Sequence, residues 1–125
     1  MESTAQVILF DPNCPQRAVM EHLASRWGVL VQIVLLRGTH RFNELRREVG
    51  GVSEKMLSQT LQALERDGVV HRLVHPVIPP HVDYSLTELG VQTATAMQQL
   101  FELIGDRWGE FAGAQQEYDE RKGRV

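Results

Sequence analysis

Five polar side chains recur at helical spacing in one stretch of the chain and could read the edges of DNA bases. They are Lys55, Ser58, Gln59, Gln62 and Arg66. At helical spacing they face away from the stripe formed by Leu57, Leu61 and Leu64 on the same helix. Each carries a hydrogen-bond donor, and the polar stripe contains no carboxylate, although most surface helices mix acids into their exposed face. The pattern predicts a DNA-reading helix, and a merely solvated helix face is the alternative.

This helix is the second of an amphipathic pair. In residues 42–49, apolar side chains at i, i+3 and i+7 give the first helix one buried face, and the glycines at 50–51 end it. The hydroxyl of Ser53 can cap the second helix, which Asp67 and Gly68 end. Two such helices joined by a short turn that contains glycine predict a helix-turn-helix.

Two runs rich in β-branched residues follow, at 69–74 and 82–86, and are predicted to form strands. The loop between them contains three prolines, and a short strand near Arg41 is expected to complete the sheet. A helix-turn-helix followed by a hairpin predicts a winged helix, whose hairpin (the wing) can lie along the DNA backbone. The basic side chains predicted to contact phosphates are Arg41, Arg72, His75 and His81.

Four motifs in combination resemble the HxlR family of MarR-like winged-helix transcriptional regulators. They are RFNELRR, S-x-K-M-L-S-Q-x-L, L-E-x-D-G and PP-x-V-x-YSLTELG. The resemblance is close over residues 14–90, and the helix that follows matches only in character. It implies a homodimer on a roughly palindromic operator. It assigns the start of the DNA-reading helix to Ser53, Lys55, Ser58, Gln59 and Gln62, and the wing to residues 76–81.

The chain departs from the family pattern in two places. The wing has Val77 and His81 where the family commonly has an acidic and a basic residue. Ala24, Ser25 and Arg26 stand where the family often has Gly-Gly-Lys.

Cys14 is a candidate redox or electrophile sensor. It precedes a helix predicted to start at Pro15 and to end near Trp27, and amide donors and the helix dipole at such a position stabilise a thiolate, with Arg17 one turn further on. Some members of the resembling family sense oxidants or quinones through a cysteine here. The alternative is a structural cysteine that acts as a small hydrophobe. Either an oxidant or a small molecule near Trp27 and Trp108 could be the effector.

The histidines do not predict a metal site. His71 and His75 share one strand face and His81 lies across the hairpin, but only Asp83, whose side is left open, could complete a ligand set. Phosphate contacts are the preferred interpretation. No cofactor is predicted. The chain is not expected to be an enzyme, because it has no nucleophile–base motif, no Gly-rich phosphate loop and no paired carboxylates.

The expected fold is mainly α with a small β-hairpin wing, dimerising through its N- and C-terminal helices. The predicted organisation is one domain: an arm at 1–13 that is either mobile or crosses to the other subunit, helices at 14–37, the helix-turn-helix and wing at 38–86, a dimerisation helix at 87–112 and a frayed polar tail at 113–125. An apolar stripe marks the dimerisation helix. Its proposed interface residues are Met97, Phe101, Ile104 and Trp108.

Charge distribution agrees with a DNA-binding face. The net charge is −3, yet residues 37–75 hold seven Lys or Arg against five Asp or Glu. No apolar run reaches the ~20 residues of a membrane span, and no signal peptide is evident. With a single cysteine, these features predict a cytoplasmic protein with double-stranded DNA as its partner and no membrane association. A winged-helix protein-interaction module without an operator is the alternative function.

Overall fold

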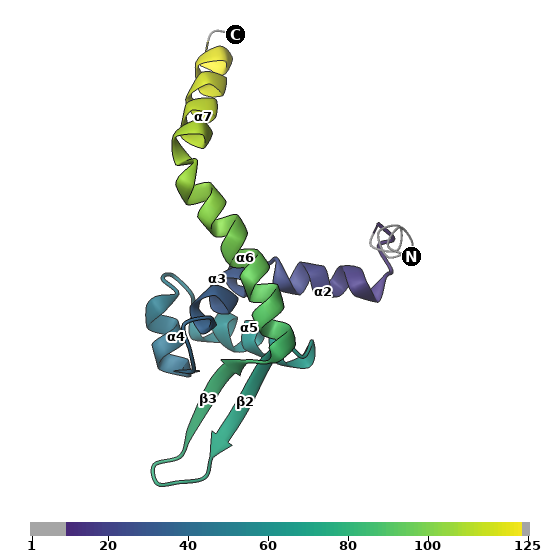
Figure 1. The fold of residues 1–125 in the computed structure, drawn as a ribbon, viewed down its shortest axis with the longest axis vertical. Helices are drawn as coiled ribbons and strands as arrows, with labels where there is room; N and C mark the ends of the chain where they lie inside the picture. Colours follow the sequence, from purple (N-terminus) through teal and green to yellow (C-terminus); the bar gives the residue numbers. More distant parts are fainter. Residues whose placement is uncertain (1–9, 124–125) are drawn as a thin grey trace.

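A computed structural model describes residues 10–123 and has a mainly helical fold with one small sheet (Figure 1). In chain order the elements are α2 (Pro15–Leu23), α3 (Arg26–Leu35), β1 (His40–Arg41), α4 (Phe42–Glu48), α5 (Glu54–Arg66), β2 (Val70–His75), β3 (His81–Leu86), α6 (Glu88–Asp106) and α7 (Trp108–Gly123). This is the predicted winged helix-turn-helix. Residues 1–9 of the predicted arm lie outside the described residues.

Hydroxyl caps start several helices where the sequence places them. The Ser53 hydroxyl accepts a hydrogen bond from the Met56 amide at 3.1 Å, and the Thr87 hydroxyl accepts one from the Gly90 amide at 3.0 Å. Gly68 follows α5 with a φ of 82°, a conformation that glycine adopts readily. The boundaries of α5 are therefore set by its own sequence, as predicted.

The core lies between α3, α4, α5 and the sheet. Leu57, Leu61 and Leu64 of α5 are at most 2% exposed, which confirms them as the buried stripe. Leu45 of α4 and Val31 of α3 are also fully buried among them. Burying an aliphatic side chain of this size contributes roughly 1.5–3 kcal/mol, so α5 is held mainly by its apolar face.

A buried amide ties three helices together. Gln32 of α3 is fully buried, and its Nε2 donates to the carbonyls of Leu23 at 2.9 Å and Gly28 at 3.0 Å. Its Oε1 accepts from the hydroxyl of Thr93 in α6 at 2.8 Å. Every polar atom of this side chain is satisfied, so it joins the end of α2 to α3 and α6.

The strands form an antiparallel sheet in the order β1-β3-β2. Tyr84, which packs against the core, pairs with Arg72 on β2, so these side chains share the inner face of the sheet. Asp83 pairs with both Arg41 and Leu73, and His75 pairs with His81, which places these residues on the outer face. The hairpin projects from the body of the domain (Figure 1).

Two predicted boundaries near the N-terminal helix are wrong. Helix α2 ends at Leu23, not near Trp27, and α3 begins at Arg26. The cause is local: Ser25 caps α3 by accepting from the Gly28 amide at 3.1 Å, and its hydroxyl donates to the carbonyl of His22. A new helix therefore starts where the sequence was expected to continue the old one.

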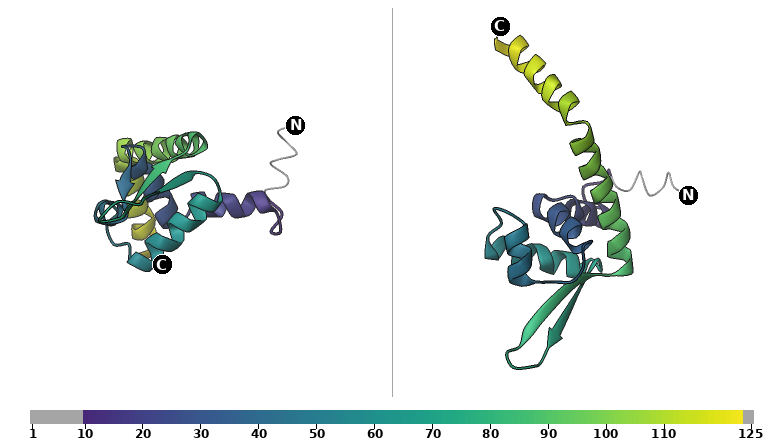
Figure 2. Two further views of the ribbon diagram at one scale, coloured as in Figure 1. Left: turned by 90° about the horizontal axis from the view of Figure 1, so that it is seen from below. Right: turned by 60° about the vertical axis from the view of Figure 1, so that its left-hand side comes forward.

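The C-terminal region also differs from the prediction. The expected single helix at 87–112 breaks at Arg107, whose φ of −113° and ψ of 26° are not helical, and α7 then continues through the predicted frayed tail to Gly123. Residues 114–122 are mostly good helix formers, and Gln116 donates to Glu120 one turn later. The end of α6 and all of α7 project away from the body, as the right-hand view of Figure 2 shows. No helix in the described residues is long and apolar enough to cross a membrane.

Candidate nucleic-acid interface

The side of α5 opposite its buried leucines is exposed and rich in donors. Lys55, Gln59, Gln62 and Arg66 are exposed, and Ser58 is half-buried on the flank. Neither Lys55 nor Arg66 forms an ion pair with any residue in the described part of the chain. This side of the helix can therefore offer its hydrogen-bond donors to a ligand.

A groove runs between α5 and the inner face of the wing. It is lined by Ser58, Leu61, Gln62, Glu65, Arg72 and Tyr84. The structure thus brings Arg72 together with two of the predicted DNA-reading residues, Ser58 and Gln62. Glu65 adds a carboxylate to the same groove.

Gln59 lies on the other side of α5, toward α2. It lines a hollow with Glu21, His22, Ser25, Thr60 and Ala63. Beside this hollow the His22 ring is 2.7 Å from the Asp67 carboxylate, which is only 3% exposed. The contact fixes the C-terminal end of α5 against α2, so the two flanks of α5 have different surroundings.

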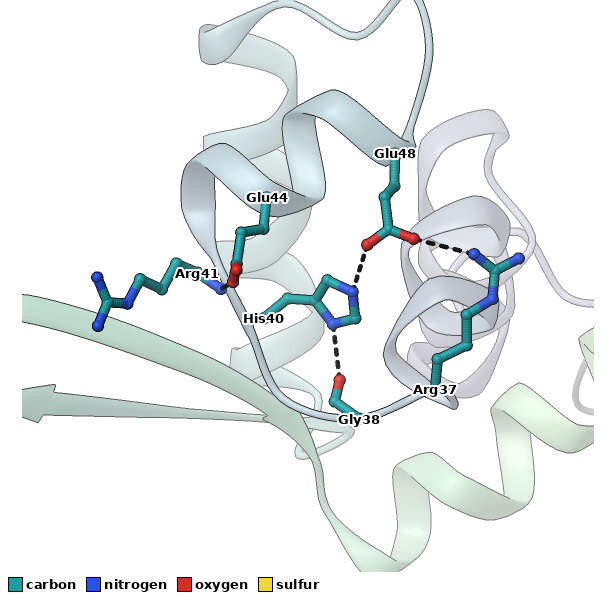
Figure 3. A network of polar contacts seen from close by, with 6 residues as sticks. All are labelled: Arg37, Gly38, His40, Arg41, Glu44 and Glu48. Atoms are coloured by element: carbon teal, nitrogen blue, oxygen red, sulfur yellow. Dashed lines mark hydrogen bonds and ion pairs between the residues drawn. The ribbon is translucent and has the colours of Figure 1, made fainter.

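A polar network ties both ends of α4 to the segment that precedes it (Figure 3). The His40 ring bridges the Gly38 carbonyl, at 2.7 Å, and the Glu48 carboxylate, which also accepts from Arg37 at 2.9 Å. The Arg41 amide donates to Glu44 at 2.7 Å, while the Arg41 side chain points away from the network. The network orients α4, and a longer contact of 3.9 Å between Arg46 and Glu54 links α4 to α5.

The remaining wing residues do not gather around α5. Arg41, His75 and His81 lie on the outer face of the sheet, opposite Arg72. The structure instead groups the two histidines with Asp83, the residue whose side the sequence analysis left open. The sequence already indicated part of this grouping, because His81 and Asp83 are two residues apart on one strand and so share a face.

Cys14 is the N-cap of α2 and is buried, with its thiol 3.0 Å from the Gln16 side-chain oxygen. Arg17 is turned to other partners, the carbonyl of Phe10 at 3.2 Å and the carboxylate of Glu21 at 3.6 Å. The thiol therefore makes no cap hydrogen bond with the amides of α2, and the guanidinium is not hydrogen-bonded to it.

The apolar stripe near the C-terminus is uncovered within the chain. Phe101 is 52% exposed and Trp108 is 54% exposed, with Ile104 also exposed and Met97 half-buried. Trp108 belongs to α7, where its ring stacks on Phe111 at a centroid distance of 6.5 Å. Trp27, in contrast, packs against the core of the domain.

A sequence profile of the HxlR-like helix-turn-helix family matches residues 22–112, from the end of α2 to the start of α7. The chain belongs to this family. It is 56% identical over 96 residues to the HTH-type transcriptional regulator YtfH of Escherichia coli K12, a match that covers 77% of this chain and 76% of that protein. The HxlR-like chain is therefore a transcriptional regulator with a DNA-binding fold, and neither its family nor the similar proteins are enzymes.

Solved structures agree with the fold. The putative transcriptional regulator YtfH from Salmonella typhimurium superposes with a TM-score of 0.81 at 50% identity, covering 86% of this chain and 96% of that one. The oxidised form of the redox regulator HypR superposes with a TM-score of 0.69 at 34% identity, covering 75% and 97% of the two chains.

Proposed function

We propose that this HxlR-like regulator is a homodimer that reads a palindromic operator by placing α5 of each copy in the major groove. The observation that carries the proposal is the exposed row of Lys55, Gln59, Gln62 and Arg66 on α5. Lysine and arginine can pair with guanine, and glutamine with adenine, through the donors and acceptors of the major groove. Ser53 and Ser58, at the start of the helix, complete the proposed contact set.

Arg72 extends this surface toward the phosphate backbone. It lines the groove beside α5, so a duplex that receives α5 would pass close to its guanidinium. Arg41, His75 and His81 lie on the other face of the sheet. We assign these three only to phosphate contacts around the wing, without a part in base reading.

The proposed dimer uses the projecting C-terminal helices together with α2. Met97, Phe101, Ile104 and Trp108 are assigned to the interface, and the exposure of all but Met97 supports this assignment, because a chain gains by removing such an apolar stripe from water. To match two half-sites, a twofold pair must present its two copies of α5 about one turn of duplex apart, ~34 Å.

Cys14 is the proposed redox centre. Its place at the N-terminus of α2 supports a reactive thiol, and HypR, a redox regulator, has a similar fold. We expect diamide to weaken operator binding by the native protein and to leave a Cys14→Ser variant unaffected. Equal responses of the two proteins would exclude this role.

The central test is a gel shift against the intergenic DNA upstream of the chain's own gene. Replacing Lys55 and Gln59 together with alanine should abolish specific binding, since base contacts contribute roughly 1–3 kcal/mol each. Replacing Lys122 and Gln116 of α7 with alanine removes the same residue types elsewhere and should leave binding intact.

Both variants should keep the oligomeric state of the native protein. If no fragment binds even at low salt, the chain instead fits a protein-interaction module with a winged-helix fold. If the α5 variant binds as well as the native protein, α5 does not read the operator.

A further inference from the structure

The outer face of the wing gathers three metal-ligating side chains at the end of the hairpin. His75 and His81 are directly opposite each other on β2 and β3, and Asp83 is two residues further along β3. One ligand atom from each of the three lies within 4.8 Å of the other two. The His75 Nε2 is already 2.8 Å from a carboxylate oxygen of Asp83, and the two imidazole rings stack at a centroid distance of 4.5 Å.

We propose that His75, His81 and Asp83 bind a divalent transition-metal ion of the Zn²⁺ type. Two imidazole nitrogens and one carboxylate oxygen form a ligand set that suits Zn²⁺, with bonds of roughly 2.0–2.2 Å. Ligand atoms around a tetrahedral ion are then about 3.3 Å apart. Small rotations of these half-buried side chains reach that spacing, and solvent supplies the fourth ligand.

The contacts around the three residues leave room for the ion. The His75 side chain is 35% exposed and that of Asp83 is 27% exposed, so water and ions reach them. Within the described residues, the His81 ring makes no hydrogen bond, which leaves its nitrogens able to ligate. The ion would replace the hydrogen bond between the His75 Nε2 and Asp83, and His75 would ligate through Nε2 as the neutral tautomer that carries its one proton on Nδ1.

The nearest cations do not occupy the same position. Arg41 is the cross-strand neighbour of Asp83 on the outer face, but it forms no ion pair with Asp83 in the described part of the chain. Arg72 lies on the opposite, inner face. Asp83 therefore brings a negative charge to the two histidines that favours a dication.

Binding would link the two strands at the end of the hairpin that the rest of the domain covers least. Leu73 and Val74 are 47% and 48% exposed, and Ile78 in the loop is fully exposed, so this end of the hairpin is poorly covered. An ion held by residues of both strands would restrict the wing. This inference concerns metal binding alone and does not depend on an operator.

The test is titration of the untagged, metal-free full chain with Zn²⁺ by calorimetry. We expect one ion per chain, and about 100-fold weaker binding after His81→Gln or Asp83→Asn, since even a group that only supports a ligand contributes about 10- to 100-fold. His71→Gln removes an exposed histidine of the same strand face and should bind like the native chain. Circular dichroism would verify that each variant folds.

Co²⁺ gives a second readout, through visible absorption bands that should appear with the native chain and with His71→Gln and be absent with Asp83→Asn. Absence of saturable Zn²⁺ binding would overturn the proposal. So would Zn²⁺ binding that persists undiminished in both His81→Gln and Asp83→Asn, or that His71→Gln weakens as much as they do.

Discussion

Helices α5 and α6 are both amphipathic, but only α5 covers its apolar face within its own chain. The leucines of α5 are at most 2% exposed, whereas Phe101 and Ile104 of α6 are 52% and 38% exposed. Helix α5 buries its apolar face in the core and exposes its polar side, whereas α6 leaves apolar side chains exposed to solvent. In the proposed dimer, α5 recognises the DNA and α6 forms the interface between the two copies.

The largest predicted effect follows from charging the uncovered stripe. Phe101→Glu combined with Ile104→Glu should convert the proposed dimer to a monomer, because two buried carboxylates per chain cannot be desolvated without partners. Operator affinity should then fall by about 10²- to 10⁴-fold, as the advantage of binding two linked half-sites is lost. Light scattering and gel shifts measure the two quantities.

The matched control places the same charges on the opposite side of α6, with Gln92→Glu and Gln99→Glu. Both residues are exposed, and we expect the dimer to persist. If the two double variants behave alike, the stripe is not the interface.

The next largest effect is expected at Gly90, where α6 packs against the segment that follows α5. A Cβ at Gly90 would lie 1.9 Å from the carbonyl oxygen of Val69, so Gly90→Ala must push α6 away from the end of α5. Overpacking of this kind costs about 1–3 kcal/mol of unfolding free energy, and a backbone clash is at the upper end. Urea denaturation measures the loss.

Gly105→Ala is the control, because open space surrounds that position. Alanine in place of glycine inside a helix should stabilise by about 0.5–1 kcal/mol. Equal losses in both variants would contradict the assignment of Gly90 to a tight contact.

A smaller effect is expected at the buried amide. Gln32→Leu leaves the Leu23 carbonyl without its side-chain donor and leaves the Thr93 hydroxyl only the Gly90 carbonyl, at 3.1 Å, which should destabilise the chain by about 1–3 kcal/mol. Adding Thr93→Val should recover part of this loss, and a double-mutant cycle in urea would measure the coupling. Strictly additive effects would show that the two side chains act independently.

The smallest effect lies at the bend between α6 and α7. The Arg107 guanidinium donates two hydrogen bonds of 2.6 Å to Glu110 and lowers the pKa of that carboxyl. Any stabilisation is present above the unfolded pKa of Glu110 and is lost as pH falls through the lower, folded value. The pair is fully exposed, so we expect no measurable change in Tm. Carbon NMR titration should show the Glu110 pKa rising in Arg107→Gln, and an unchanged pKa would contradict the contact.

The helix-turn-helix could be predicted because its signals are local. Leucine spacing, the Ser53 cap and Gly68 define α5 without reference to any distant residue. The buried role of Gln32 could not be predicted in this way, since its partner Thr93 is 61 residues away. The position of Asp83 depended on strand register, which pairs His75 with His81 and therefore brings Asp83 beside them.

The errors at the ends of the chain have a different origin. The break before α3 depends on the Ser25 hydroxyl, which donates to the His22 carbonyl and accepts from the Gly28 amide. The spacing of apolar residues gives no indication of such contacts. Helix α7 has no buried residue, so its polar composition was taken for a frayed tail. Helix-forming residues maintain it without a core.

One short connection couples the two helices compared above. Thr87, at the start of α6, donates its hydroxyl to the Gly68 carbonyl at 2.7 Å, and its amide donates to Val69 at 3.1 Å, so the last residues after α5 are bonded directly to the base of α6. These hydrogen bonds couple the orientation of α5 to that of α6. If α6 tilted against a second copy of the chain, α5 would therefore move with it, and the separation of the two copies of α5 would change.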